Sequence, residues 1–507
     1  MMSASGAPPI RSAARIVAGG LLIPAVAGAA CALAFAPFYM WPVEIVALAV
    51  LFGVWARSGS PRQAWLSGFA FGLGYFLAGV SWIFVSLHEF GGMPAILAAL
   101  ATFILCAYLA LFAAFAGWIA VRWGGASIGR RVGMAAAAYV ALEWLRSTLF
   151  TGFPWLNTGT SQAPSSPLAG FAPLLGTYGV SLAVTASAAL LVLLVLARAH
   201  ARMRFHALAA LAALFLAGGL VRLVGWTEPA GAPVRVALLQ GNVAQEIKWR
   251  EEVRTATLLE YRRMIFDADA RVVVIPETAL PAFLDQLPAD YLQSLRDDAR
   301  LHGKDILLGT VERTPRDGDA DYYNSLVRIT GDGRESYRKR HLVPFGEFIP
   351  PGFSWALAIL HIPMSDFSRG RTTQPAIEAG GVRFGVAICY EDMFGEEMID
   401  FLPSAQALVN VSNDAWFGHS LEADQHLQGS QMRALETGRW MVRATNTGAT
   451  AAIDHEGRIV ARLAEFTRGT LYAQVVPRTG MTPYARTGNA PILVLLAALV
   501  LGMRRRA

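Results

Sequence analysis

Charged residues are scarce in this sequence. Asp, Glu, Lys and Arg make up only 16% of its 507 residues, against about a quarter in an ordinary soluble domain, and 54% are hydrophobic. The mean hydropathy is +0.41. A chain of this length and hydropathy is predicted to contain membrane-spanning segments and more than one domain. The net charge is +6, but the basic residues do not gather in one patch, so nucleic acid binding is not expected.

Cysteine is also rare. Cys31 and Cys106 lie in long apolar runs and are interpreted as small buried hydrophobes, whereas Cys389 lies in a region of mixed polarity. Three cysteines provide no disulfide framework, and the unpaired Cys389 stands out for that reason. The nine histidines show no His-x-x-x-His spacing and no glycine-rich phosphate loop is present, so neither a metal nor a cofactor is expected.

Lysine is rare in this sequence as well. Of the 43 basic residues only three are lysine: Lys248, Lys304 and Lys339. Lys339 stands between two arginines in the stretch RKR, in a chain that otherwise uses arginine almost everywhere. A compact ammonium differs from a planar guanidinium in what it can stabilise. The isolated lysine is therefore a weak indication of a specific task.

Long apolar runs dominate the first 225 residues and return once near the end. A spanning helix needs roughly 20 apolar residues. More apolar runs follow the first at once, so it is interpreted as a span and not as a cleaved signal peptide. Eight spans are predicted, at residues 16–34, 41–56, 64–87, 94–121, 132–150, 176–198, 205–224 and 488–503.

Arginine placement predicts the topology, because basic loops stay on the cytoplasmic side. Basic residues flank alternate ends of the predicted spans, and the loops 35–40, 88–93 and 151–175 contain none. Both termini are therefore predicted to be cytoplasmic, with residues 226–487 on the outer side, which is the periplasm in a bacterium with two membranes. The basic residues concerned are Arg11, Arg15, Arg57, Arg62, Arg122, Arg130, Arg131, Arg198, Arg202, Arg204, Arg504, Arg505 and Arg506.

A transporter would also have many spans, but usually with ionisable residues inside several of them. Here Glu143 and Arg146 are the main pair, interpreted as a bundle-facing or interfacial ion pair. A transporter does not need a soluble insert full of strands. The predicted organisation is a helical membrane domain over residues 1–225, a soluble domain over 226–487, and a final helix with a basic tail over 488–507.

The soluble segment alternates strand-like and helix-like stretches. Strands are predicted at residues 234–242, 271–277, 306–312, 381–391, 407–414 and within 448–462, helices at 255–269 and 291–305, and a hairpin at 324–341. Strands that are apolar on both faces, with helices between them, indicate a layered α/β domain.

Three chemically distinct groups follow strands of this domain: Glu277, Lys339 and Cys389. Sites in α/β sheets collect at the carboxyl ends of strands, so the three are predicted to converge. A carboxylate can take the proton of a thiol as it attacks, and an ammonium can stabilise the oxyanion that forms. The structural alternatives are packing for Cys389, helix capping for Glu277 and a solvated hairpin position for Lys339. The residues alone predict a Cys acyl-transfer or amide-hydrolysis site.

Four separated motifs sharpen this prediction. The stretches IPETALP (275–281), YRKRHLVPFGEFIP (337–350), AICYEDMF (387–394) and SNDAWFG (412–418) resemble the motifs of the nitrilase superfamily. That resemblance implies a Glu-Lys-Cys triad on an α-β-β-α sandwich. QMRALETGR (431–439) and TPYARTGN (482–489) are similar to its integral membrane branch, the apolipoprotein N-acyltransferases, over essentially the whole chain.

The resemblance assigns roles position by position. It implies that Glu277 is the general base, Lys339 the oxyanion stabiliser and Cys389 the nucleophile, and that Glu347 supports the triad. Further positions match residues around the pocket, where Glu391 could equally be a helix-start acid and the two tryptophans core packing. These are Trp249, Tyr390, Glu391, Asn413 and Trp416.

The resemblance also implies a reaction. Cys389 would take an acyl chain from a phospholipid and pass it to the α-amine of diacylglyceryl-cysteine in an apolipoprotein, without a cofactor, at the outer face of the bacterial inner membrane. A monomer is expected. The alternatives are a membrane-tethered amidase that uses water as the acceptor and a non-catalytic scaffold that keeps the fold.

Overall fold

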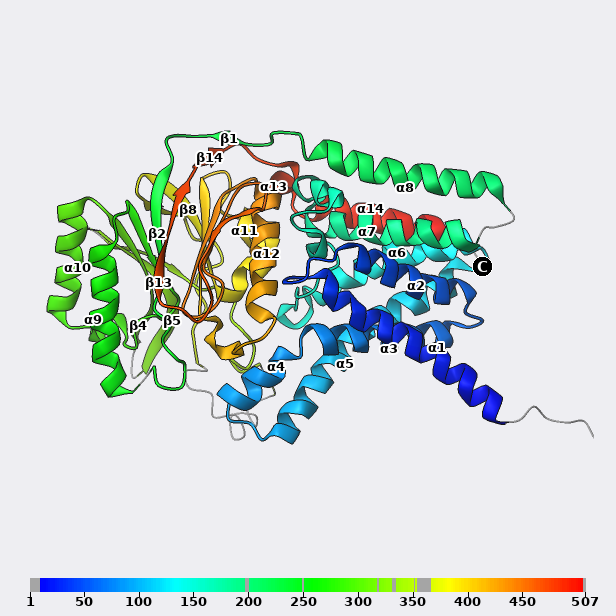
Figure 1. Ribbon diagram of the computed structural model, residues 1–507, viewed down its shortest axis with the longest axis horizontal. Coiled ribbons are helices and arrows are strands. Elements are labelled where there is room, and N and C mark those ends of the chain that lie inside the picture. The colour runs from blue at the N-terminus through cyan, green and yellow to red at the C-terminus, as the bar shows by residue number, and fades with distance from the viewer. Residues whose placement is uncertain are drawn as a thin grey trace, which may run out of the picture.

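The computed structural model has a helical part and a sheet part joined side by side (Figure 1). It describes residues 10–196, 200–248, 250–316, 319–330, 334–350, 352 and 366–504. The helical part is built from the described residues between 10 and 221 and from α14 (Ala490–Met503), which returns to it near the end of the chain. The sheet part holds the polar residues singled out from the sequence.

A helix forms in each of the eight apolar runs, but the count of eight spans is not confirmed. Three described helices are long and apolar enough to cross a membrane, Ala95–Gly124, Pro167–Leu196 and Ala201–Val221, or up to four with the pair Pro61–Gly79 and Trp82–Phe90, bent by 52°. Eight spans therefore remain a prediction. The helices are α1 (Ile10–Ala30), α2 (Pro42–Arg57), α3 (Pro61–Gly79), α4 (Trp82–Val85), α5 (Ala95–Gly124), α6 (Ile128–Arg146), α7 (Ala172–Leu196) and α8 (Ala201–Val221).

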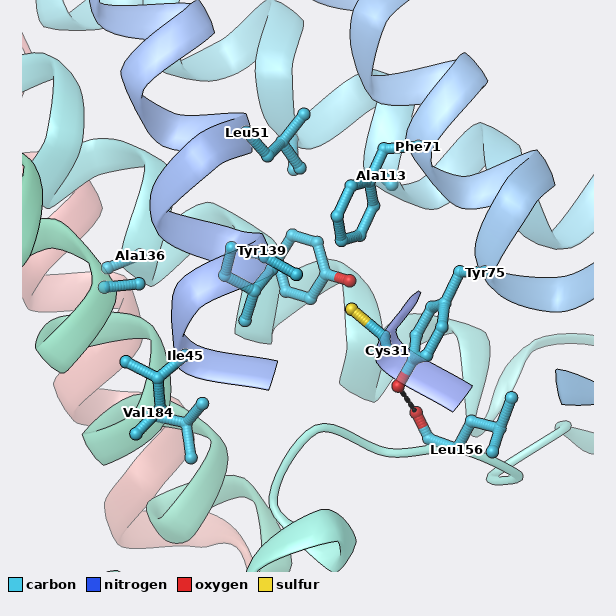
Figure 2. Close-up of a cluster of buried hydrophobic side chains, with 14 of the residues drawn as sticks. Cys31, Ile45, Leu51, Phe71, Tyr75, Ala113, Ala136, Tyr139, Leu156 and Val184 are labelled. Carbon is cyan, nitrogen blue, oxygen red and sulfur yellow. Dashed lines mark hydrogen bonds between the residues drawn. The ribbon is translucent and has the colours of Figure 1, made fainter. Parts of the chain in front are cut away.

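Small residues let these helices approach closely. Gly28 of α1 lies against the Phe71 carbonyl of α3, and Gly74 of α3 lies against the Ala25 carbonyl of α1, so a side chain at either glycine would collide with backbone. Cys31 is fully buried beside Tyr75, whose hydroxyl donates a 2.9 Å hydrogen bond to the Leu156 carbonyl (Figure 2). The interpretation of Cys31 as a buried core residue is confirmed.

Two six-stranded sheets form the centre of the sheet part. The first has the order β13-β2-β3-β4-β5-β6 and the second β12-β11-β10-β9-β8-β7, with parallel strands at the centre of each. The strands are β2 (Val234–Gln240), β3 (Val272–Ile275), β4 (Asp305–Arg316), β5 (Asp319–Ile329), β6 (Arg334–Arg338), β7 (Ile377–Ala379), β8 (Val382–Ile388), β9 (Ala407–Ser412), β10 (Met441–Thr445), β11 (Ala451–Ile453), β12 (Ile459–Arg462) and β13 (Gly469–Val475). A small pair, β1 (Glu228–Pro229) and β14 (Arg478–Thr479), joins the two ends of the domain.

Alternation along the strands sorts their side chains into layers. Val236, Val274 and Val409 lie in the core between the sheets, whereas Leu239 and Ile275 pack on the outer face of the first sheet. Helices α9 (Glu251–Asp267) and α10 (Ala289–His302) cover that outer face, and α11 (Gly395–Ile399) and α12 (Glu422–Thr437) cover the second sheet. The predicted α-β-β-α sandwich is confirmed.

Helix α12 lies between the second sheet and the helical part, so it is buried on both sides (Figure 1). Its glutamine side chains form hydrogen bonds with polar groups of the helical part. The Gln425 side-chain oxygen accepts from the indole N–H groups of Trp82 (3.1 Å) and Trp155 (2.8 Å). Gln428 accepts from the Ala36 amide at 2.8 Å and donates to the Ala163 carbonyl at 2.9 Å. The sheet part is thus hydrogen-bonded onto the helical part.

Replacing Gln425 with Ala should destabilise this junction. Two buried indole N–H groups would lose their acceptor, and each unsatisfied buried donor costs about 1–3 kcal/mol. We expect a melting temperature several degrees lower for the detergent-purified protein, measured by intrinsic fluorescence. Gln293→Ala, on an exposed face of α10, is the matched control. Equal melting temperatures for the two variants would contradict the role given to Gln425.

Candidate active site

The three predicted residues lie at strand ends, as expected. Glu277 comes two residues after β3, Lys339 directly after β6, and Cys389 directly after β8. The Lys339 Nζ is 3.6 Å from the Glu277 Oε1, and the charges of both residues act on the Cys389 thiol. The structure therefore brings the carboxylate, the ammonium and the thiol together, which is the arrangement that the sequence predicts.

Lys339 is held by two carboxylates. Its Nζ donates a 2.8 Å hydrogen bond to the Glu347 Oε1, in addition to the ion pair with Glu277. Its exposed fraction is only 1%. Burial alone would lower the pKa of this amine, but the charges of Glu347 and Glu277 outweigh burial and raise it above its ordinary value. Lys339 is therefore a fixed cation, suited to hold an oxyanion.

Asn324 is a site residue that the sequence analysis missed. It lies in β5, and its side-chain amide donates to the Glu277 Oε1 at 2.6 Å and to the Glu347 Oε1 at 3.0 Å. Its backbone carbonyl accepts from the Lys339 amide at 2.8 Å. One residue thus fixes both carboxylates and the lysine. A buried asparagine within an otherwise apolar strand, here NSLVRI, is the signal that was available.

Lys248 is a second buried lysine near the site. Its Nζ donates to the Thr278 hydroxyl at 3.3 Å, next to Glu277 in the chain. Burial lowers the pKa of Lys248 to about 8, although the charge of Glu277 opposes this shift. The three lysines of the sequence are therefore not equivalent: Lys339 has two close carboxylates, Lys304 pairs with Asp298 at 2.8 Å, and Lys248 donates to a hydroxyl.

Cys389 sits on a sharp turn. Its φ is +54°, in the left-handed region that side chains other than glycine rarely adopt, and a short 3₁₀ helix, Cys389–Met393, begins at this residue. The Asn410 side chain donates to the Cys389 carbonyl at 2.9 Å. Burial and the charges of Glu277 and Asp414 raise the pKa of the Cys389 thiol well above its ordinary value, while Lys339 opposes them. The thiol is thus protonated at rest and needs a base.

Glu391 connects the strand that ends at the thiol to the loop that carries the lysine. Its carboxylate accepts from the backbone amides of Ile388 (2.8 Å), Arg340 (2.7 Å) and His341 (3.1 Å), and from the Tyr337 hydroxyl at 3.1 Å. Burial and the charge of Glu397 raise the pKa of Glu391 to about 7, although the backbone amides favour its anion. Its contacts place it in a buried bridge between these two segments.

The other predicted pocket residues differ in whether they contact the active site. The Tyr390 hydroxyl donates to the Gly152 carbonyl of the membrane part at 2.7 Å, and its ring stacks with Trp155. The Asn413 backbone amide donates to the Glu277 Oε2 at 2.9 Å, so Asn413 touches the site. Trp416 contacts Phe90 edge to face and lies away from the triad's hydrogen bonds. The prediction for Trp249 falls outside the described residues.

One cluster in the described chain has donors of the kind that bind metals. Asp414, Glu422 and His426 bring ligand atoms within 4.8 Å of one another. The Arg443 guanidinium already lies among them, 3.0 Å from Asp414 and 2.8 Å from the His426 Nδ1. A fixed positive charge repels a metal cation, so these residues do not fit a metal site.

Comparison with known proteins agrees with this geometry. The family model described as apolipoprotein N-acyltransferase N-terminal domain matches residues 27–190, and the carbon-nitrogen hydrolase model matches residues 235–484. An apolipoprotein N-acyltransferase of Nitrosomonas europaea is 49% identical over 476 residues, covering 94% of this chain and 95% of the relative. The chain belongs to the apolipoprotein N-acyltransferase family. The family member of Methylococcus capsulatus is 46% identical, with 95% of this chain and 94% of the relative covered.

Solved structures are similar to about half of this apolipoprotein N-acyltransferase family member. The Caenorhabditis elegans NitFhit protein is 19% identical with a TM-score of 0.39, covering 52% of this chain and 65% of that one. A carbon-nitrogen hydrolase of Helicobacter pylori is 17% identical with a TM-score of 0.35, covering 48% and 89%. The family assignment rests on the family models and the relatives.

The state of the resting thiol can be measured directly. Because burial raises its pKa, the rate of Cys389 alkylation by iodoacetamide should keep rising from about pH 6 to beyond about pH 9. Peptide mass spectrometry after timed labelling gives the rate at Cys389 alone. A rate that already levels off below neutral pH would show a resting thiolate paired with Lys339 and contradict this expectation.

Asn324→Asp tests the hydrogen bonds that hold the two acids. The substitution keeps the size of the side chain but puts a third carboxylate where a donor stood between Glu277 and Glu347. Loss of one positioned donor in such a site costs on the order of 10²-fold in rate. We expect a loss of that size in acyl transfer. Unchanged activity in the folded variant would remove Asn324 from the site.

Proposed function

We propose that this protein transfers an acyl chain from a phospholipid to the N-terminal α-amine of a diacylglyceryl-cysteine apolipoprotein through a thioester on Cys389. The observation that carries the proposal is the convergence of Glu277, Lys339 and Cys389 in one buried site at the strand ends. The names of relatives 40–49% identical over most of the chain support the same reaction class.

The first half-reaction acylates the enzyme. Glu277 takes the thiol proton as the Cys389 sulfur attacks the ester carbonyl of the phospholipid, and a new S–C bond forms. The Lys339 ammonium stabilises the oxyanion of the tetrahedral intermediate. The ester C–O bond then breaks, Glu277 returns the proton to the departing alkoxide, and a lysophospholipid leaves. The acyl chain remains as a thioester.

The second half-reaction removes the acyl chain from Cys389 and regenerates the free enzyme. The neutral α-amine of the apolipoprotein attacks the thioester carbonyl, Glu277 accepts a proton from the attacking nitrogen, and the C–S bond breaks. The proton returns to the Cys389 sulfur, the product is an amide, and no cofactor takes part. Glu347 serves by holding Lys339 in place. All of these residues come from one chain, which supports a monomer as the working unit.

The hydrogen bonds of the membrane loops support the proposed topology. The basic loops meet at one side: Arg131 donates to the carbonyls of Ala56 (3.2 Å) and Ser58 (2.8 Å), and the Arg504 guanidinium lies over the Trp123 ring. This side of the helical part faces away from the sheets (Figure 1). Basic loops are expected in the cytoplasm.

The loops on the opposite side contact the sheet part. Residues 35–40 and 151–175 contain no Lys or Arg, and they contact α12 through Ala36 and Ala163. This arrangement supports cytoplasmic termini and a catalytic domain, residues 226–487, at the outer face of the inner membrane. Both lipid substrates are available there. The boundaries at residues 225 and 488 belong to the same proposal.

Intact mass tests the thioester. The purified protein is incubated with phospholipid and no acceptor, beside Cys389→Ala. We expect one added acyl mass on the parent alone, removed by neutral hydroxylamine, because the thiol is the only group given a covalent role. An adduct on both proteins, or none on either while the lipid stays intact, would contradict the proposal.

A second arm identifies the acceptor. Adding a diacylated lipopeptide with a free N-terminus should discharge the adduct and yield an N-acylated peptide. The matched peptide with a blocked N-terminus is the control, because it has the same lipid anchor and no nucleophile. Equal discharge by both peptides, with release of free fatty acid, would instead support the amidase-like use of water.

A further inference from the structure

A second polar cluster lies near Cys389, on the face of the second sheet that packs against α12. Alternation along β9 and β10 points Asn410, Ser412 and Arg443 toward α12, while their neighbours Val409 and Val442 face the core between the sheets. β9 and β10 run parallel in a register that pairs Asn410 with Arg443. Three polar side chains therefore meet in a layer that is apolar elsewhere.

Arg443 is the centre of this cluster. Its side chain is fully buried. Its Nη2 donates to the Asp414 Oδ1 and Oδ2, at 3.1 and 3.0 Å, and its Nη1 donates to the Asn410 Oδ1 at 3.1 Å. Burying a guanidinium is costly unless its charge and donors are matched. The described neighbours match its charge and both terminal nitrogens, while its Nε has no hydrogen-bond partner among them, so the two Nη groups fix its orientation.

Two branches lead from Arg443 to the nucleophile. In the first, Asn410 accepts from Arg443 and donates to the Cys389 carbonyl at 2.9 Å. In the second, Asp414 accepts from Arg443 and from the Ser412 hydroxyl, the latter at 2.5 Å, and the register that pairs Ile388 with Val411 places Ser412 beside Cys389. One guanidinium is therefore linked both to the Cys389 carbonyl and to the residue beside the Cys389 side chain.

Helix α12 closes the cluster from the other side. His426 contacts the Arg443 Nη2 through its Nδ1 at 2.8 Å and the Asp392 Oδ1 through its Nε2 at 2.7 Å. The Ser430 hydroxyl donates to the Asp392 Oδ2 at 2.5 Å. Asp392 itself comes three residues after the nucleophile. The turn that starts at Cys389 is thus tied at both ends to one buried network.

We propose that Arg443 is a positioning residue for the nucleophile, which holds the left-handed turn at Cys389 and the thiol direction through Asn410 and through Asp414 with Ser412. This proposal rests on the proposed role of Cys389 as nucleophile. The backbone at Cys389 is strained, and such a conformation persists only when surrounding contacts over-determine it. The two branches supply those contacts without a hydrogen bond to the side chains of Glu277 or Lys339.

The task requires an arginine. A guanidinium presents its donors in a rigid planar fork, so one side chain can hold an amide and a carboxylate at a fixed angle. An ammonium in the same place would keep the charge but could not hold both groups at that angle. Arg443→Lys therefore removes the orientation and keeps the ion pair with Asp414.

Arg439→Lys is the matched control. Arg439 is also fully buried, four residues earlier in the chain, but its guanidinium donates to the backbone carbonyls of Ala405 at 2.9 Å and Gly480 at 2.7 Å. Among the described residues, its hydrogen bonds reach neither Cys389 nor the branches described above. Both variants replace a buried guanidinium, so both should lower the melting temperature.

The experiment measures the nucleophile itself. Purified parent, Arg443→Lys, Arg439→Lys and the milder Ser412→Ala are labelled with iodoacetamide below their melting temperatures, and the Cys389 rate is read by peptide mass spectrometry. Acyl-enzyme formation is then followed against phospholipid concentration. A shift of about 1 Å in a reacting group can cost on the order of 10²-fold in rate.

For Arg443→Lys we expect a loss approaching that size in both the alkylation rate and the maximal acylation rate, with the half-saturating phospholipid concentration unchanged. Ser412→Ala should show a smaller loss of the same kind, and Arg439→Lys should react like the parent. Parent-like rates in Arg443→Lys and Ser412→Ala, or equal losses in Arg439→Lys, would overturn the proposal. If Arg443→Lys does not fold, Ser412→Ala and Asn410→Ala decide it by the same measurements.

The Cys389→Ala variant distinguishes a failure of the positioning role of Arg443 from a failure of the proposed function. If Cys389→Ala abolishes the acyl adduct while Arg443→Lys reacts like the parent, only the positioning role is lost. If Cys389→Ala still forms the adduct, the nucleophile is misassigned and the proposal for Arg443 falls with it.

Discussion

The buried charge of Lys339 is the constraint on which the active site depends. An ammonium that is 1% exposed needs opposite charge at close range, and here Glu347 at 2.8 Å and Glu277 at 3.6 Å supply it. Those two acids could not lie so near each other without the cation between them. Glu277 follows β3 and the loop after β6 carries Lys339 and Glu347, whereas Cys389 follows β8 of the second sheet, so the site exists only when both sheets and the loop after β6 have assembled.

Helix α12 gives the site its second boundary. On one face Ala423, Leu427 and Ala434 pack against the second sheet, and on another Met432 and Leu435 join the core of the helical part. A helix buried on both sides has no solvent for its polar groups, so its glutamines and charged residues must all find partners in the protein. The same helix therefore carries the membrane junction and the network beneath Cys389.

Much of this could be predicted from the sequence. Strands that are apolar on both faces and end in a polar residue are visible locally, which is why Glu277 and Cys389 were found, and Lys339 was found because lysine is scarce in this chain. Asn324 and Arg443 were missed because their roles depend on cross-strand register, which local patterns do not reveal. Helix α12 was missed because polar residues are spread along it without the single apolar stripe that marks a core-facing helix. Apolar runs located the helices, but they do not settle how many cross the membrane.

The hydrogen bond from the Tyr390 hydroxyl to the Gly152 carbonyl affects whether the catalytic part could be cut out of the chain and fold alone. Tyr390 follows the nucleophile directly, and its partner belongs to a loop between two membrane helices. An excised catalytic half would lose that acceptor and expose Tyr390, Met432 and Leu435, which now lie in the helical part's core. The limits of the hydrolase-like region in the sequence are therefore not limits of independent folding. A freely soluble version would have to be redesigned along the entire outer face of α12.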